Sequence, residues 1–349
     1  MNVNTLRSAM ALAISAACLQ AAAAPVGYGA ATTGGGSKTP ITVTSLADAQ
    51  AKINAYTSGG LVLLYTGKFN YGTITDVCAQ WQKPAQTLVI KNKSNITLRG
   101  AGDSTANFGI HIVGAVNNVI VQNMTIGLLQ GGEAADSISI EGNSTGKPSN
   151  VWIDHNTIFA SLTNCPGAGD ASFDGGIDMK KGANRITISY NHVYNYQKVA
   201  LNGYSDSDTL NAGSLTTYHH NRFENVKARL PLLRHGKAHI YNNYFGNVGT
   251  SGINIRMDAL ALIESNYFEN VANPVTSRDS SRIGYWELRN NFVGSGITWT
   301  AASGTYVNAT SWATTKAYGT VPYSYAVDFA SNVKARVFST AGARTNLAQ

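Results

Sequence analysis

Short stretches of alternating hydrophobic and polar residues recur along the chain, and each is followed by Asn. With that Asn as position zero, the residues at positions −5, −3 and +2 are mostly hydrophobic, as Val151, Ile153 and Ile158 are around Asn156. Alternation with a period of two predicts β-strands. The same arrangement surrounds Asn191, Asn221, Asn243, Asn266 and Asn291, and a slightly offset copy precedes Asn123. From Asn123 to Asn291 the successive separations are 33, 35, 30, 22, 23 and 25 residues.

Repeats of this length indicate a solenoid. No helical period lies between the copies, which excludes leucine-rich, ankyrin and tetratricopeptide repeats, and a propeller blade needs roughly 40 residues. We therefore predict an all-β fold, a right-handed parallel β-helix in which each copy forms one coil. Asn tolerates the left-handed backbone conformation needed at a sharp bend, and stacked coils would align these side chains in an internal ladder. A β-sandwich with Asn at its hairpin turns is the alternative.

Two segments are suited to close the ends of the solenoid. Ser45 and Asp48 fit a capping box, which predicts a short helix. Its apolar face would consist of Leu46, Ala49, Ile53 and Tyr56. The Gly- and Thr-rich stretch 27–38 before it reads as flexible. The Tyr-rich part after Ile297 predicts an irregular C-terminal segment packed on the coils.

Residues 1–24 have the features of a signal peptide. Arg7 provides a positive start, residues 9–19 are apolar, and residues 21–24 are small. The apolar stretch is too short to span a membrane, and Ser15 argues against lipid attachment at Cys18. We expect a secreted, extracellular protein with one domain over residues 25–349, free of the membrane after cleavage and monomeric.

Cys78 and Cys165 remain after cleavage of the signal peptide. Two cysteines in an oxidising compartment usually form a disulfide. Two separate buried thiols are the alternative.

The composition limits the binding partner. Charged residues make up 13% of the chain, well below the roughly 25% of an ordinary soluble domain. The net charge is +7, which would attract a polyanion such as nucleic acid, anionic lipid or an acidic polysaccharide. The basic residues are not interleaved with aromatic residues as in a base-stacking surface, so we do not expect nucleic-acid binding.

The longer coils between Asn123 and Asn221 carry the candidate chemistry, since their additional residues should form loops on one side. Three acids lie there, Asp136, Asp174 and Asp178, and hard oxygen ligands of this kind favour Ca²⁺. Solvated loop acids are the alternative. The basic residues are Lys180, Lys198, Arg229, Arg234 and Arg256. If the coils stack, these form a row suited to a polymeric carboxylate, unless they are scattered surface cations.

Several motifs resemble the extracellular pectate lyases of polysaccharide lyase family 1. They are Val151-Trp-Ile-Asp-His155, Asp178-Met-Lys180, Ser189-Tyr-Asn191, Lys198-Val-Ala-Leu-Asn-Gly203, Thr217-Tyr-His-His-Asn221, Ala228-Arg-Leu-Pro-Leu-Leu-Arg234 and Asn273-Pro-Val-Thr-Ser-Arg278. The resemblance runs from about Val43 to the last coil. It implies a parallel β-helix that cleaves de-esterified polygalacturonate by calcium-dependent β-elimination, giving 4,5-unsaturated oligogalacturonates.

The resemblance also implies roles for individual residues. Asp136, Asp174 and Asp178 would bind Ca²⁺, and Arg229 would be the catalytic base. Lys198 and Arg234 would hold the substrate, with weaker contacts from Lys180 and Arg256. The chain departs from the family at Ala134, where an additional Asp is frequent, and at Asp174, where Glu is common. Glu133 is close enough in sequence to replace the missing acid.

An arginine base needs a physical reason, because a free guanidinium is treated as always charged. A site crowded with positive charge would disfavour its charged form. The alternative role for Arg229 is a clamp for a carboxylate. Asp154 and His155 are adjacent in a predicted strand, so their side chains should point to opposite faces, and we assign them a structural role.

Three other functions share the predicted fold. A pectin lyase acting on methylated substrate would not need the three acids. A polygalacturonase would hydrolyse with paired carboxylates, and no Asp-Asp pair supports this. A non-catalytic polysaccharide-binding β-helix would not require Arg229 together with the acids.

Overall fold

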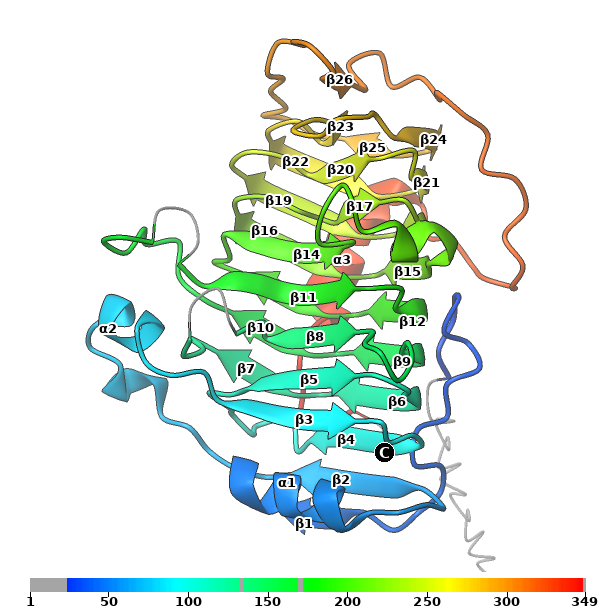
Figure 1. The fold of residues 1–349 in the computed structure, drawn as a ribbon. Helices are drawn as coiled ribbons and strands as arrows, with labels where there is room; N and C mark the ends of the chain where they lie inside the picture. The colour runs from blue at the N-terminus through cyan, green and yellow to red at the C-terminus, as the bar shows by residue number, and fades with distance from the viewer. Residues whose placement is uncertain (1–23, 132–134, 169–171, 348–349) are drawn as a thin grey trace, which may run out of the picture.

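Three parallel sheets follow one another around each coil of the computed structural model, which describes residues 24–131, 135–168 and 172–347 (Figure 1). In one coil these are β12 (Asn184–Ser189) of the first sheet, β13 (His192–Tyr194) of the second and β14 (Lys198–Asn202) of the third. Strands of successive coils pair in parallel, so the predicted parallel β-helix is confirmed and the sandwich alternative is wrong.

The remaining strands stack in the same three sheets. The first sheet also contains β1 (Ile41–Val43), β2 (Leu61–Tyr65), β4 (Ile96–Gly100), β6 (Asn117–Gln122), β9 (Ser149–Asp154), β15 (Leu215–His219), β18 (Lys237–Tyr241), β21 (Leu260–Glu264) and β24 (Tyr285–Arg289). The second adds β7 (Thr125–Gly127), β10 (Thr157–Phe159), β16 (Arg222–Val226), β19 (Tyr244–Val248), β22 (Tyr267–Val271) and β25 (Phe292–Val293). The third adds β3 (Thr87–Lys91), β5 (Gly109–Val113), β8 (Ile138–Glu141), β11 (Asp174–Lys180), β17 (Leu232–Arg234), β20 (Ile253–Arg256), β23 (Val275–Ser277) and β26 (Val307–Asn308). β26 pairs antiparallel to β23.

The core lies inside the coils. Ile186 and Ile188 of β12 are fully buried and lie in register with Val151 and Ile153 of β9. On the second sheet, Phe245 stacks between the rings of neighbouring coils, at centroid distances of 5.6 Å and 4.8 Å. The alternating pattern of the sequence therefore corresponds to the inward positions of the strands.

The predicted Asn ladder exists at the bend between the first and second sheets. Asn191 Nδ2 donates to Asn221 Oδ1 at 3.0 Å, and the chain of amide hydrogen bonds continues from Asn156 to Asn291. The predicted reason is wrong, however, because the ladder residues are not left-handed. The residue before each of them has a positive φ, as Tyr190 does at 52°. Asn123 occupies this preceding place, and the backbone N–H of Met124 donates to the first ladder amide, which explains the offset copy.

Both predicted ends are present. Helix α1 (Leu46–Ala55) begins at Ser45, whose side chain accepts a hydrogen bond from Asp48 N, and it buries Ala49 and Ile53 against the first coil. The segment after Ile297 is largely irregular, as predicted. It also contains α3 (Ala330–Thr340), which the sequence analysis did not predict and which buries Val333 and Val337 against the second sheet.

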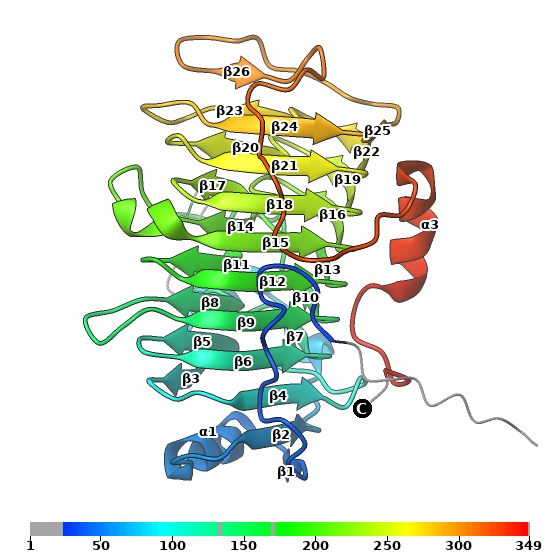
Figure 2. The ribbon, with the colours of Figure 1, turned by 90° about the vertical axis from the view of Figure 1, so that its right-hand side faces the viewer.

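Residues 27–38 lie along the outer face of the first sheet rather than forming a flexible stretch (Figure 2). The backbone N–H of Gly29 donates to Thr187 Oγ1 at 3.0 Å, and a Cβ at Gly29 would lie 2.9 Å from Thr187 N. The glycines of this segment therefore allow close backbone approach to the sheet.

Candidate functional site

Charged residues from successive coils meet where the third-sheet strands begin. Asp174 at the start of β11 is in register with Lys198 at the start of β14, and Lys198 is in turn bridged to Ala228, the residue before Arg229. Lys198 Nζ lies 3.4 Å from Asp174 Oδ2, and Arg229 Nη1 lies 3.9 Å from Asp174 Oδ1. Two of the predicted cations, Lys198 and Arg229, thus converge on the carboxylate of a third predicted site residue, Asp174.

The other two predicted calcium ligands share a lysine. Lys180 Nζ lies 2.6 Å from Asp136 Oδ2 and 3.4 Å from Asp178 Oδ2. Gly175 leaves room for the Asp136 carboxylate, because a Cβ at position 175 would lie 1.9 Å from Asp136 Oδ1. Burial raises the pKa of Asp178 well above its ordinary value, and the negative charge of Asp136 adds to the shift. Burial opposes the charge on Lys180, but the two carboxylates outweigh it and raise the pKa of Lys180.

The acids fit a hard cation chemically, although they do not form a preformed cage. Asp174 Oδ1 is buried without a hydrogen-bond partner among the described residues. Carboxylate oxygens of this kind are the ligands that Ca²⁺ prefers. Within residues 24–131, 135–168 and 172–347, no group of three His, Cys, Asp or Glu side chains is arranged to hold a metal ion. Ala134 and Glu133, the positions of the predicted departure, lie outside the described residues.

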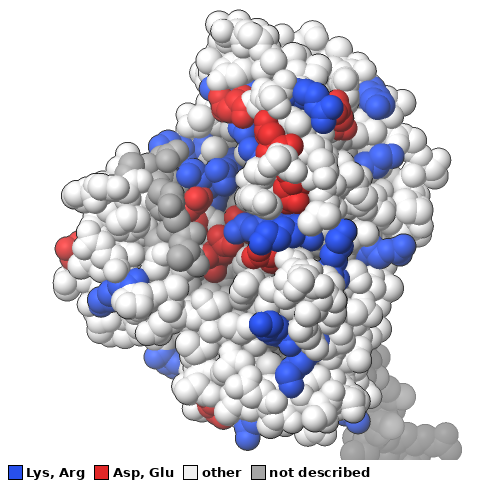
Figure 3. All heavy atoms as spheres, in the orientation of Figure 1, with Lys and Arg blue, Asp and Glu red and all other residues white. Residues whose placement is uncertain are grey.

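Two further predicted cations extend the site along the solenoid. Arg234 at the end of β17 and Arg256 at the end of β20 are in register. Arg256 Nη2 lies 3.4 Å from Asp279 Oδ2. Burial lowers the pKa of Arg256 to about 10, and the positive charge of Arg234 contributes. Acidic and basic side chains gather on this face of the molecule (Figure 3). Arg234 and Arg256 therefore lie on neighbouring strands of the same sheet that carries Asp174 and Asp178.

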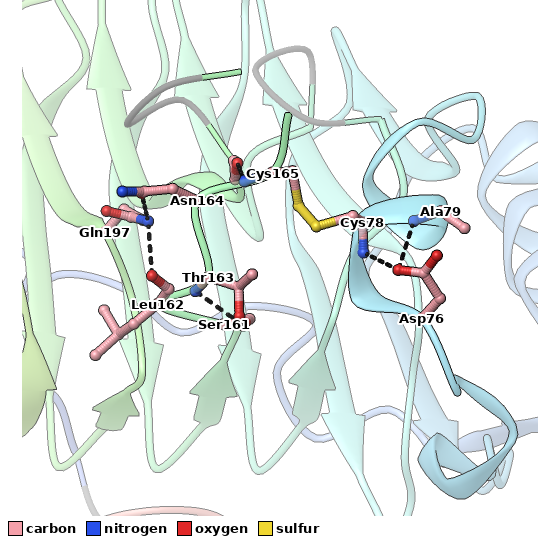
Figure 4. The surroundings of a disulfide bond; sticks show 10 residues. Asp76, Cys78, Ala79, Ser161, Leu162, Thr163, Asn164, Cys165 and Gln197 are labelled. Carbon is pink, nitrogen blue, oxygen red and sulfur yellow. Dashed lines mark hydrogen bonds between the residues drawn. A yellow bond between two sulfur atoms is a disulfide. The ribbon is translucent and has the colours of Figure 1, made fainter. Parts of the chain in front are cut away.

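The predicted disulfide between Cys78 and Cys165 is present (Figure 4). It joins helix α2 (Val77–Trp81) to the loop that follows β10. The side chain of Gln197, directly before Lys198, donates to Leu162 O at 3.2 Å and to Asn164 Oδ1 at 2.8 Å. The disulfide therefore anchors a loop that contacts the turn leading to Lys198.

Two acids that pair with site arginines were missed by the sequence analysis. Asp206 Oδ1 accepts a hydrogen bond from Arg234 Nε, and Asp279 pairs with Arg256 and Arg278. The long separation between Asn191 and Asn221 signals an insertion that contains Asp206, but spacing does not say which of its residues faces the site.

A cavity of about 490 Å³ lined by residues including Leu162 and Lys227 contains none of the predicted site residues.

The geometric argument about Asp154 and His155 is wrong. His155 Nδ1 lies 2.6 Å from Asp154 Oδ2. Strand β9 ends at Asp154, and His155 has a φ of 51°, so its side chain turns back toward Asp154. Asp154 is fully buried and also accepts a hydrogen bond from Ser189 Oγ at 2.6 Å. Both residues lie on the first sheet, so the contact does not bring them to the charged site on the third.

The N-terminal leader predicted over residues 1–24 lies almost wholly outside the described residues. In the part of the chain that the structure describes, no helix has both the length and the apolar character needed to cross a membrane.

The chain is similar to known pectate lyases over most of its length. A family model described as pectate lyase matches residues 2–346. Pectate lyase II from Xanthomonas campestris pv. campestris is 67% identical to this chain, with a TM-score of 0.91. The match covers 93% of this chain and all of that one. Pectate lyase C from Erwinia chrysanthemi, solved with Ca²⁺, is 38% identical with a TM-score of 0.84, covering 93% of this chain and 97% of that one.

A mutant of pectate lyase C in complex with pentagalacturonic acid has the same identity, 38%, and a TM-score of 0.85. The match covers 94% of this chain and 98% of that one. These similarities extend across the charged site and both ends of the solenoid.

Proposed function

Because the chain belongs to the pectate lyase family, we propose that it cleaves de-esterified polygalacturonate by calcium-dependent β-elimination and releases 4,5-unsaturated oligogalacturonates. The observation that carries this proposal is the convergence of Lys198 and Arg229 on Asp174 in the third sheet. Cations beside carboxylates suit a substrate that is itself a polymeric carboxylate and that binds together with a metal ion. The relatives solved with Ca²⁺ and with pentagalacturonic acid support the same chemistry.

Asp136, Asp174 and Asp178 would hold the calcium ion. The buried Asp174 Oδ1, which lacks a hydrogen-bond partner among the described residues, supports this assignment. Bound Ca²⁺ supplies positive charge that neutralises the C6 carboxylate of a galacturonate and makes its C5 proton more acidic.

Arg229 would take the C5 proton, while Lys198 and Arg234 hold substrate carboxylates. The electron pair of the C5–H bond forms the C4–C5 double bond, and the bond from C4 to the glycosidic O4 breaks. O4 leaves with the electron pair of the broken C4–O4 bond and takes up a proton from solvent, and the sugar that keeps the C4–C5 double bond becomes the unsaturated end.

Ultraviolet absorbance of the unsaturated product tests the reaction directly. Purified protein should generate absorbance from polygalacturonate with added Ca²⁺, and EGTA should abolish it. New reducing ends without absorbance would mean hydrolysis and would overturn the proposal. A higher rate on methyl-esterified pectin, insensitive to EGTA, would favour a pectin lyase.

Arg229→Lys tests the identity of the base. We expect kcat to fall at least about 100-fold, because a positioned general base typically contributes a factor of 10² to 10⁴. Arg336→Lys, on helix α3 away from the third sheet, is the matched control and should retain activity. Retention of most activity in Arg229→Lys, with an unchanged pH profile, would show that Arg229 is a carboxylate clamp.

We also propose that the protein is secreted and extracellular, as the sequence of residues 1–24 suggests. We propose that it is monomeric, because stacked coils of a solenoid bury one another without a partner chain. N-terminal sequencing of the exported protein should find a start near residue 25. Gel filtration of the exported protein should give the apparent mass of a single chain, and the protein should stay in the supernatant when membranes are sedimented.

A further inference from the structure

A loop after β14 is hydrogen-bonded to the turn after β23, three coils further along the solenoid. The carboxylate of Asp206 accepts hydrogen bonds from Ser281 N at 2.9 Å, from Ser281 Oγ at 3.1 Å and from Ser280 Oγ at 3.1 Å. Ser280 and Ser281 follow Asp206 by 74 and 75 residues in the sequence. Strands β17 and β20 lie between them in the third sheet. The hydrogen bonds of Asp206 therefore span two intervening coils, the one that carries Arg234 and the next.

The same carboxylate orients Arg234. Arg234 Nε donates to Asp206 Oδ1 at 2.8 Å, and Arg234 Nη1 donates to Gly203 O at 2.9 Å. His235 Nε2 also lies 2.9 Å from the backbone oxygen of Asp206. The bonds to Asp206 and Gly203 engage Nε and Nη1 of the guanidinium, and Nη2 has no hydrogen-bond acceptor within the described ranges.

The electrostatics favour a permanently charged Asp206. Burial opposes its ionisation, but the hydrogen bonds from Ser281, Arg234 and Ser280 outweigh burial and hold the pKa of Asp206 well below its ordinary value. The side chain of Arg234 is only 12% exposed, so few of its conformations compete with the observed one. A fixed planar guanidinium presents its remaining N–H groups in one direction, which suits recognition of a carboxylate.

We propose that Asp206 is a positioning residue for substrate binding, which holds Arg234 so that Nη2 is presented to a galacturonate carboxylate. This inference rests on the proposed function, in which Arg234 binds the substrate. Asp206 itself does not touch the reacting atoms. Its removal should therefore weaken binding of polygalacturonate more than it slows the chemical step.

A double-mutant cycle tests the inference. The variants are Asp206→Ala, Arg234→Ala and both together, each measured for kcat and KM on polygalacturonate with Ca²⁺. We expect Asp206→Ala to raise KM about tenfold and to leave kcat within about twofold. In the Arg234→Ala background the same substitution should change KM less than about twofold, because a residue that acts only through Arg234 has nothing left to position.

A matched control separates positioning from general loss of an acid. Asp258→Asn removes an exposed carboxylate that pairs with Arg282 on the neighbouring turn, and it should leave KM unchanged. Thermal melting of every variant shows whether the fold is intact. If Asp206→Ala does not fold, the cycle with Asp206→Asn, which keeps the side-chain shape, decides the question.

Two results would overturn the inference while the wild type remains active. These are an unchanged KM in Asp206→Ala, or equal and additive effects of Asp206→Ala with and without Arg234. An inactive wild type on polygalacturonate would instead overturn the proposed function, together with the inference that rests on it.

Discussion

The ammonium group of Lys180 lies between two acids that we propose as calcium ligands. Its ammonium contacts both Asp136 and Asp178, and all three side chains are at most 21% exposed. Two carboxylates this close to one buried site would repel each other strongly without a positive charge. We therefore expect the lysine to stabilise the fold when no calcium is bound and, under the proposed function, to compete with calcium for the same oxygen atoms.

Lys180→Gln should expose this competition. Without Ca²⁺ we expect the free energy of unfolding to fall by about 3 kcal/mol, because removal of one partner leaves buried charge uncompensated. Calcium should raise the melting temperature of this variant more than that of the wild type. Thermal melts with Ca²⁺ and with EGTA measure both effects. Lys181→Gln, which breaks a more exposed pair with Glu141, is the control. An equal calcium response in all three proteins would contradict the competition.

At the scale of the coil, the bend between the first and second sheets depends on two neighbouring residues with different roles. The first takes the left-handed conformation, and the Asn after it supplies the amide hydrogen bonds. Asn221 Nδ2 donates to Ile188 O and to Asn243 Oδ1, both at 2.9 Å, while its Oδ1 accepts from the backbone and side chain of Asn191. Because all four bonds are buried, the ladder satisfies backbone groups that water cannot reach.

Asn221→Ala should therefore destabilise the protein by about 3 kcal/mol, since buried partners of Asn221 are left unsatisfied. Asn291→Ala, at the more exposed end of the ladder, should cost about 1 kcal/mol. Urea denaturation of the two variants measures the difference. Equal losses would mean that the ladder amides contribute independently of their burial.

The outer face of the first sheet carries buried histidines beneath the C-terminal segment. His219 and His220 contact each other at 3.0 Å, and His220 Nε2 lies 3.3 Å from Asp328 Oδ2. His239 lies 2.7 Å from the hydroxyl of Tyr323. Burial lowers the pKa of His220 to about 4, although Asp328 opposes the shift. Burial also lowers the pKa values of His219 and His239.

These shifts predict loss of stability in acid. A histidine with a lowered folded-state pKa takes up its proton more readily in the unfolded chain, so stability falls as pH decreases from about 6.5 to about 4. For His220 alone the loss is about 3 kcal/mol. His220→Gln should flatten the dependence by about that amount in urea denaturation across this range. A parallel slope in His220→Gln would refute the assignment.

At the scale of the whole molecule, contacts between neighbouring coils are joined by links between more distant parts of the sequence, such as the hydrogen bond from Gly29 N to Thr187 Oγ1. The disulfide is one of these links, since Cys78 and Cys165 are 87 residues apart. It ties helix α2, outside the coils, to the loop after β10 (Figure 4). A cross-link of this span restricts the unfolded chain considerably.

The double variant Cys78→Ser with Cys165→Ser should lose about 4 kcal/mol of stability, the amount expected for a closed loop of this length. Reduction of the wild type should give the same loss, and it should have no effect on the double variant. Denaturation with and without reductant measures both. An undiminished stability after reduction would show that the loop after β10 is held by its other contacts.

The sequence by itself determined the coils, the inward-facing residues and the N-terminal helix. These follow from local rules, the period of two in each strand and the Ser45 cap, which need no knowledge of distant residues. The motifs at Lys198 and Arg229 also carried the resemblance from which the candidate site was predicted. The paired cysteines followed from their number and compartment rather than from geometry.

Only the tertiary structure decided which charges meet. The contacts of Asp174 with Lys198 and Arg229, and of Asp206 with Ser281, join residues from different coils, and their register depends on loop lengths that sequence spacing leaves open. His155 shows the same limit at one residue, because its left-handed backbone reverses the direction that strand alternation predicts. A periodic pattern specifies the repeated coil, whereas the site is built from the interruptions of that pattern, and these acquire their positions only when the coils stack.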